Sequence, residues 1–193
     1  MAPGGEYVIP VGSSYSRNDD RTLQSKIISD GINLIGPTIK HQQENNSSCL
    51  ASSLASSLSF VREEEIARRL LRYYNEIVQN KLPISFEMKH VLQVMLENHG
   101  RKKFEKKWKG KGEKVKKPNT MEILLSCEAN SIYHCVLINH HAVALVDKWI
   151  FDPLLHKAMP RDEKHLRFSS QRENYESSDE IITQCYKYTL HQK

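Results

Sequence analysis

The stretch that decides the fold is Gln42–Phe60, "QQENNSSCLASSLASSLSF". Its second half repeats leucine every four residues, at Leu50, Leu54 and Leu58, which is the spacing of one face of an α-helix. The polar run before Cys49 consists of residue types that cap helices, so a helix is predicted to begin at this cysteine. The alanines and serines between the leucines favour close packing of this helix against a sheet.

The cysteine at the start of this helix has two interpretations. Cysteine is commonly a small, buried, apolar side chain. A thiol in the first turn of a helix, however, lies near backbone N–H groups without intrahelical partners and near the positive end of the helix dipole, and both favour the nucleophilic thiolate. A nucleophilic cysteine also needs a base and a group that orients the base, and the rest of the chain must supply both.

The stretch His140–Pro153, "HHAVALVDKWIFDP", offers both groups in a predicted β-hairpin. If residues 147–148 form a two-residue turn, the alternation of side chains places His141 and Asp152 on one face as diagonal neighbours, and His140 on the other. A shift of the strand register by one residue would reverse this assignment. The alternative interpretation is a surface histidine followed by an Asp-Pro turn.

Gln43 lies six residues before Cys49, where its side-chain amide could donate to a developing oxyanion together with the N–H of the cysteine. In this order, Gln43, Cys49, His141 of "HAVALV" and Asp152 of "WIFDP", the residues resemble those of a papain-like cysteine peptidase. The spacing from glutamine to cysteine also matches that family. The closest similarity is to compact members that process the leader peptides of bacterial exporters, and it covers residues 42–153.

The resemblance implies a thiol hydrolase that cleaves peptide or isopeptide bonds in a protein or peptide substrate, without a metal or cofactor. It assigns the nucleophile to Cys49, the base to His141, the orienting group to Asp152 and the oxyanion donor to Gln43. The chain departs from the family where Leu follows the cysteine, since many relatives have Gly or Trp there. The sequence "NSSC" also differs from the Asp-Gly-x-Cys motif of ovarian-tumour deubiquitinases.

The order of the predicted elements indicates an α+β fold, with helices first and strands later. Residues 1–41 are expected to form an extended N-terminal arm with a short helix near 22–28, and residues 42–193 to form the domain. Further helices are predicted at 63–79 and 86–98. Strands are predicted at "MEILLSC", "SIYHCVLI", "HAVALV", "WIF" and "IITQCYKYTL". The resemblance implies that the cysteine-bearing helix packs on a C-terminal antiparallel sheet.

One segment concentrates positive charge. Arg101–Lys117, "RKKFEKKWKGKGEKVKK", holds ten basic and two acidic residues, a local charge of +8, so the rest of the chain carries −3 of the total of +5. This basic insert is predicted to bind an acidic partner or nucleic acid, with Phe104 or Trp108 stacking on bases. The alternative function of the whole protein is therefore a binding module on a catalytically inactive fold.

Compartment and metal content are predicted from weaker signals. No run approaches the ~20 apolar residues of a membrane span, and the start lacks the pattern of a secretory signal, so an intracellular protein, cytoplasmic or nuclear, is expected. The four scattered cysteines predict no disulfide framework. A metal site remains an alternative, although zinc ligands usually have tighter, paired spacings. Its ligands would come from Cys127, His134, Cys135, His140 and His141.

Overall fold

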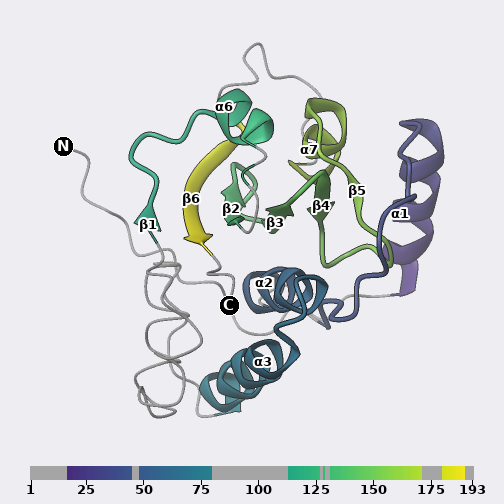
Figure 1. Cartoon of the computed structure of the whole chain (residues 1–193). Coiled ribbons are helices and arrows are strands. Elements are labelled where there is room, and N and C mark those ends of the chain that lie inside the picture. The colour runs from purple at the N-terminus through teal and green to yellow at the C-terminus, as the bar shows by residue number, and fades with distance from the viewer. Residues whose placement is uncertain are drawn as a thin grey trace.

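A six-stranded antiparallel sheet forms the centre of the molecule in the computed structural model (Figure 1). The structure describes residues 17–44, 48–79, 113–126, 128, 131–170 and 180–189. The strand order is β1-β6-β2-β3-β4-β5. The strands are β1 (Glu113–Lys114), β2 (Ser131–Leu137), β3 (Ala142–Val146), β4 (Trp149–Phe151), β5 (Met159–Pro160) and β6 (Ile182–Thr189).

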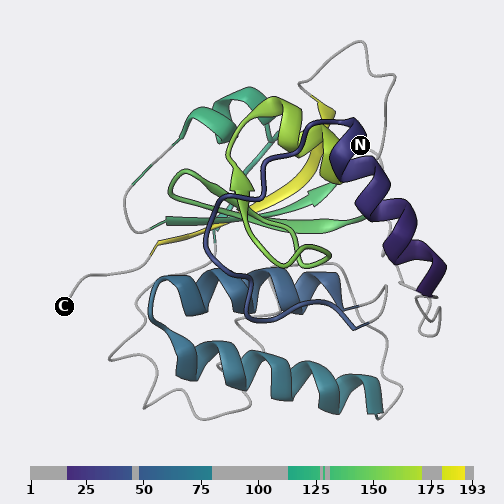
Figure 2. The ribbon, with the colours of Figure 1, turned by 90° about the vertical axis from the view of Figure 1, so that its right-hand side faces the viewer.

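Helices cover both faces of this sheet. Helix α2 lies against one face, with α3 packed on its outer side, and α6 and α7 lie on the opposite face (Figure 2). Helix α1 lies at the β5 end of the sheet (Figure 1). The helices are α1 (Arg17–Ser29), α2 (Cys49–Phe60), α3 (Glu64–Gln79), α6 (Thr120–Leu125) and α7 (Glu163–Ser170).

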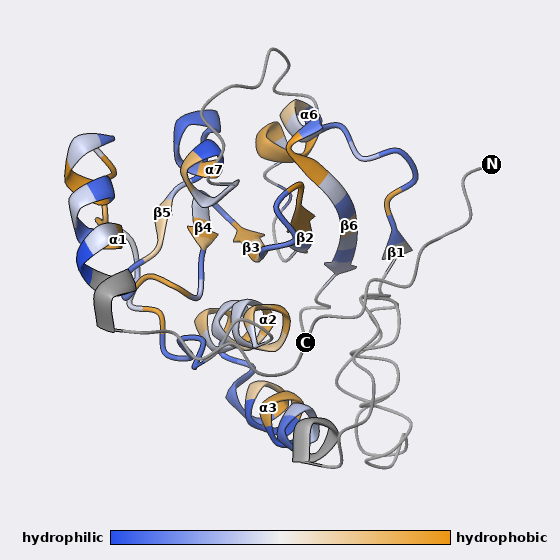
Figure 3. Cartoon of the chain, turned by 180° about the vertical axis from the view of Figure 1, so that it is seen from behind, coloured by the Kyte–Doolittle hydropathy of each residue, from blue (hydrophilic) through white to orange (hydrophobic). Residues whose placement is uncertain are grey.

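Coverage of both faces explains why the central strands are almost continuously apolar. Every residue of β2 and β3 is buried, and both strands are largely hydrophobic (Figure 3). A strand with a single buried face would alternate apolar and polar residues instead. Close approach of α2 to this sheet requires small side chains between its buried leucines, Leu50, Leu54 and Leu58.

Helix α2 meets this requirement with small side chains. All its residues from Cys49 to Ser59 are buried. Two of its serines bond to carbonyls of their own preceding turn: Ser53 Oγ donates to Leu50 at 3.2 Å and Ser57 Oγ to Leu54 at 2.7 Å. Ser57 therefore satisfies its hydroxyl within the helix, whereas the Ser53 hydroxyl also lies 3.0 Å from Nε2 of His134 on β2. The predicted close packing of this helix on the sheet is confirmed.

The predicted α+β class and the helices starting near residues 49 and 63 are confirmed, with α2 and α3 at these places. Four of the five predicted strands are found as β2, β3, β4 and β6. The strand predicted at "MEILLSC" is wrong, because residues 120–125 form helix α6. Asn119 caps that helix by accepting a hydrogen bond from the N–H of Glu122 at 3.1 Å.

Three further elements were not anticipated, and some predictions fall outside the described residues. Helix α7 and strand β5 were not predicted, and Glu113–Lys114 of the basic insert form the edge strand β1, which pairs with β6. The insert therefore contributes to the sheet at its C-terminal end. The helix predicted at 86–98, Cys127 and the insert residues 101–112 lie outside the described residues.

The N-terminal segment begins with α1, which is longer than the short helix expected there. Residues 30–44, the N-terminal strap, then follow the edge of the domain toward α2. The strap is held by main-chain hydrogen bonds at intervals along its length. These are Asn33 N to His165 Nε2 (3.1 Å), Gly36 N to Ala158 O (3.0 Å), Ile39 N to His156 O (2.9 Å), His41 N to Ser56 Oγ (3.1 Å) and Gln43 N to Pro153 O (2.9 Å).

Gly36 is the tightest point of the strap. A Cβ atom there would lie 2.6 Å from the carbonyl oxygen of Ala158 and 2.7 Å from Cε3 of Trp149. We expect Gly36→Ala to lower the free energy of unfolding by ~1–3 kcal/mol, as in other overpacked sites. The matched control is Ile35→Ala, because Ile35 is 70% exposed; denaturant unfolding of both variants measures the difference, and equal stability would contradict this packing.

Candidate active site

The β3–β4 hairpin has the predicted register. Val146 pairs with Trp149 and Ala144 with Phe151 across a two-residue turn. His141 directly precedes β3 and Asp152 directly follows β4, so the hairpin brings the two residues to the same end. The side-chain alternation on which the sequence argument depended is therefore confirmed.

The two side chains meet in a short hydrogen bond. Nε2 of His141 lies 2.7 Å from Oδ1 of Asp152. The side chains are 10% and 2% exposed, respectively. Oδ1 also accepts a hydrogen bond from the main-chain N–H of Leu154 at 3.0 Å, which holds the carboxylate in the turn after β4.

Burial disfavours the charged forms of both side chains, and each charge compensates by stabilising the other. Burial alone lowers the pKa of His141, but the charge and hydrogen bond of Asp152, together with a hydrogen bond and charge interaction with Cys49, raise that pKa to about 10. Burial alone raises the pKa of Asp152, yet the charge of His141 and the hydrogen bonds that the carboxylate accepts hold its pKa below the usual range. The arrangement therefore favours an imidazolium next to a carboxylate.

Cys49 completes a row of three side chains. It is the first residue of α2 and is 2% exposed, and the interaction with its side chain helps to raise the pKa of His141. Because Nε2 of His141 is bonded to Asp152, the other ring nitrogen, Nδ1, is the one that remains for the thiol. The three side chains come from α2, the start of β3 and the end of β4.

The start of α2 is built without a side-chain cap. Ser48 occupies the N-cap position but makes no side-chain capping hydrogen bond; its Oγ instead accepts from the N–H of Glu44 at 3.1 Å. The residue before Glu44 is Gln43, whose N–H donates to the carbonyl of Pro153, beside Asp152. These two hydrogen bonds hold the main chain at Gln43 and Glu44 between Ser48, which precedes Cys49, and Pro153, which follows Asp152.

His140 lies apart from this row. It is exposed, has a φ of 65° and lies in the turn before β3. A positive φ is uncommon for a residue with a side chain, and in this tight turn it separates the directions of two neighbouring histidines. The predicted difference between the two histidines is found in the structure, since His140 is exposed and His141 contacts Asp152.

Sequence reasoning missed one residue of the site. Ser169, at the end of α7, donates its hydroxyl hydrogen to Oδ2 of Asp152 at 2.6 Å. A serine at the end of an unpredicted helix carries no pattern that would single it out. Only the fold brings α7 over the hairpin.

Of the residues of the alternative metal site, the four that the structure describes, His134, Cys135, His140 and His141, do not form a metal-binding group. His134 of β2 lies under α2, where its Nε2 is 3.0 Å from Ser53 Oγ and burial lowers its pKa to about 3. Cys135 pairs across strands with Cys185, with sulfur atoms 3.4 Å apart, and burial raises the pKa of the Cys135 thiol. Within the described ranges no group of three or more His, Cys, Asp or Glu side chains could hold a metal ion.

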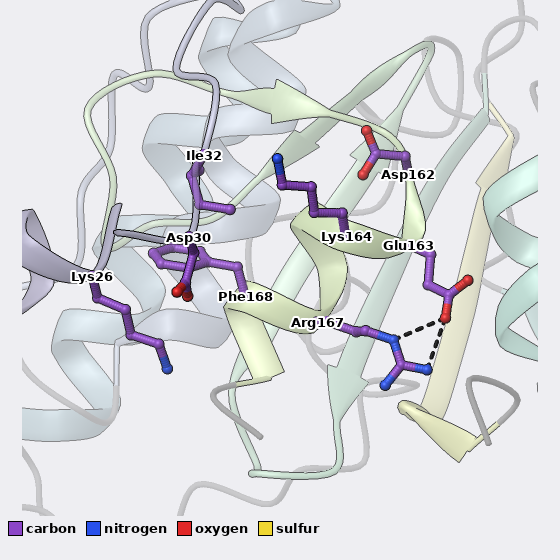
Figure 4. A pocket seen from close by; sticks show the side chains of 8 residues that line it. All are labelled: Lys26, Asp30, Ile32, Asp162, Glu163, Lys164, Arg167 and Phe168. Carbon is purple, nitrogen blue, oxygen red and sulfur yellow. Dashed lines mark hydrogen bonds and ion pairs between the residues drawn. The ribbon is translucent and has the colours of Figure 1, made fainter. Parts of the chain in front are cut away.

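A surface cavity of roughly 760 Å³ is lined by residues of α1 and α7. Figure 4 shows its charged rim, on which Arg167 and Glu163 form an ion pair of 2.8 Å. None of the four predicted site residues lines it. The lining residues are Lys26, Asp30, Ile32, Asp162, Glu163, Lys164, Arg167 and Phe168.

Comparisons of the chain with protein-family models, curated proteins and solved structures gave no match. In the part of the chain that the structure describes, no helix has both the length and the apolar character needed to cross a membrane. Functional inference therefore rests on the site itself.

The opposite pKa shifts of two buried histidines can be measured by NMR titration. We expect His141 to keep its proton up to about pH 10, and His134 to remain neutral down to about pH 3. Because the folded pKa of His141 is above its ordinary value of 6.5, the stability it contributes is fully present below about pH 6.5 and is lost as the pH rises through about 10.

The variant Asp152→Asn isolates the cause, because the amide removes the negative charge but keeps the shape. We expect the pKa of His141 to fall in this variant while that of His134 stays unchanged. An unchanged His141 titration would show that Asp152 does not hold the imidazolium.

Proposed function

We propose that the chain is a cysteine hydrolase that cleaves peptide or isopeptide bonds through an acyl-enzyme, on a papain-like fold. The observation that carries the proposal is the 2.7 Å hydrogen bond between Asp152 and His141, together with the interaction by which Cys49, at a helix start, raises the pKa of His141. A nucleophile, a base and a group that orients the base are the three parts that thiol catalysis needs. The order of Cys49, His141 and Asp152 along the chain agrees with the same proposal, as does the position of the cysteine on a helix and of the other two residues on a hairpin.

The chemistry assigns one task to each side chain. Cys49 reacts as the thiolate, with its proton held by the His141 imidazolium, and attacks the carbonyl carbon of the scissile amide. The C–N bond then breaks as His141 passes that proton to the leaving amine, leaving a thioester on Cys49. The now neutral His141 takes a proton from water, the hydroxide attacks the thioester, and the carboxylic acid product departs as the thiolate is restored beside the imidazolium. Asp152 keeps the imidazole in the required tautomer and orientation.

The oxyanion of each tetrahedral intermediate needs hydrogen-bond donors. The N–H of Cys49 lies at the start of α2, where backbone N–H groups have no intrahelical acceptor. We assign the second donor to the side-chain amide of Gln43, whose main chain is held beside Pro153. Donors at both positions would stabilise charge that develops only during the reaction.

An acidic partner is a second proposal, and exposed lysines favour it. Lys114, Lys116 and Lys117, at the C-terminal end of the basic insert, are all exposed near the sheet edge. Positive charge at this edge would attract acidic proteins or nucleic acid and mainly raise the rate of encounter. Binding of this kind is compatible with hydrolysis. Without hydrolysis, the protein would be the binding module that the sequence predicts as the alternative.

Substitutions at the proposed site test the hydrolase directly. We expect Cys49→Ala to abolish hydrolysis, and His141→Ala to lower kcat/KM by ~100-fold or more, since general acid-base catalysis contributes that much. Asp152→Asn should retain part of the activity, because an amide can still orient the imidazole. His140→Ala is the matched control for His141 and should keep nearly full activity.

A second test labels the nucleophile with a panel of peptide and ubiquitin-tail electrophiles. Mass spectrometry then identifies the modified residue. Modification confined to Cys49 supports the proposal, since Cys49 interacts with His141, whereas Cys135 contacts Cys185 and burial raises the pKa of the Cys135 thiol. Hydrolysis that survives Cys49→Ala, or equal modification of all cysteines in the folded protein, would exclude Cys49 as the nucleophile.

Replacement of Lys114, Lys116 and Lys117 by glutamine tests the acidic-partner proposal, because it removes the exposed positive charge and keeps the main chain of β1 in the sheet. We expect thermal stability and hydrolysis of a neutral peptide to stay unchanged. Hydrolysis of the same peptide with a glutamate tail should become slower at low salt, and this difference should vanish as salt rises through ~0.1 to 0.5 M. A loss that is equal for a glutamine-tailed control peptide would contradict the electrostatic role.

A further inference from the structure

The carboxylate of Asp152 accepts a different hydrogen bond at each oxygen. Oδ1 faces His141 Nε2 at 2.7 Å and also accepts from the N–H of Leu154 at 3.0 Å. Oδ2 accepts from the hydroxyl of Ser169 at 2.6 Å, and both residues are at most 3% exposed. Without Ser169, the main chain and His141 would hold only one of the two oxygens.

The main chain around Ser169 is tied to the same site. The side-chain amide of Asn139, in the turn between β2 and β3, donates from Nδ2 to the carbonyl of Ser169 at 3.1 Å. Its Oδ1 accepts from the N–H of His141 at 3.3 Å. Hydrogen bonds therefore run in a closed ring from the His141 ring to Asp152, to Ser169, to Asn139 and back to the His141 main chain.

We propose that Ser169 is a positioning residue of the proposed hydrolase, and that Asn139 holds it in place. The Ser169 hydroxyl fixes the rotation of the Asp152 carboxylate, so that Oδ1 stays directed at Nε2 of His141 and Nδ1 stays directed at Cys49. The inference rests on the proposed function, but the contact itself holds the Asp152 carboxylate whether or not a substrate is present. Ser169 touches neither Cys49 nor the reacting atoms, and it acts through Asp152.

The neighbouring serine provides a control on the same helix. Ser170 is also buried, but its hydroxyl donates to the carbonyl of Arg167 at 2.7 Å within α7 and does not reach the site. Ser169→Ala and Ser170→Ala therefore remove the same group from adjacent buried positions. Only the first removes a hydrogen bond from Asp152.

Two readouts separate positioning from a merely structural role. In Ser169→Ala we expect the pKa of His141, measured by NMR titration, to fall by about one unit or more from its value of about 10, because the carboxylate is free to rotate. We expect kcat to fall roughly 10- to 100-fold with KM nearly unchanged, since misplaced catalytic groups slow the chemical step. Ser170→Ala should leave the His141 titration and kcat at wild-type values.

A second pair of variants keeps the test valid if Ser169→Ala does not fold. Ser169→Thr and Ser169→Val have almost the same shape, and only threonine keeps the hydroxyl; the pKa of His141 should stay high in the first and fall in the second. An equal His141 titration in this pair, or equal effects of Ser169→Ala and Ser170→Ala, would overturn the proposal. If the wild-type protein hydrolyses no substrate while the titrations differ as expected, the proposed function fails and the positioning role of Ser169 stands.

Discussion

The contact between His141 and Asp152 is the constraint on which the rest of the site depends. Removing two ionised groups from water is costly, and their mutual attraction compensates only when the geometry is good and the remaining hydrogen bonds are made. The protein meets both conditions within a few residues of the β3–β4 hairpin, with Leu154 and Ser169 completing the hydrogen bonds of the carboxylate. The high pKa of His141 is the measurable consequence.

A buried charge pair needs a rigid surrounding, and the serine-rich helix provides one side of it. Small side chains let α2 lie directly on β3, which places the first residue of the helix, Cys49, against the imidazole. The N-terminal strap leads to this helix, and hydrogen bonds to Pro153 and Ser56 hold the strap in place. Helix, hairpin and strap together hold the three side chains from separate parts of the chain.

The sequence predicted the parts of the site that depend on local rules. Helix periodicity located Cys49, and side-chain alternation together with a two-residue turn separated His141 from His140. Ser169 could not be predicted, because its role comes from the packing of α7 over the hairpin and not from a pattern in the chain. Residues 121–127 were assigned to a strand because their apolar run fits either element, and a short apolar run does not decide between helix and strand. The Asn119 cap was the local signal for the helix.

The central claim is that His141, held by Asp152, keeps Cys49 in its nucleophilic form, and the rate of alkylation of Cys49 by a small neutral haloacetamide tests it most directly. At neutral pH, Cys49 of the wild-type protein should react at least ~10 times faster than Cys49 of folded His141→Ala protein, because the variant keeps the helix start but loses the imidazolium beside the sulfur. Equal alkylation rates in the two proteins would contradict the account.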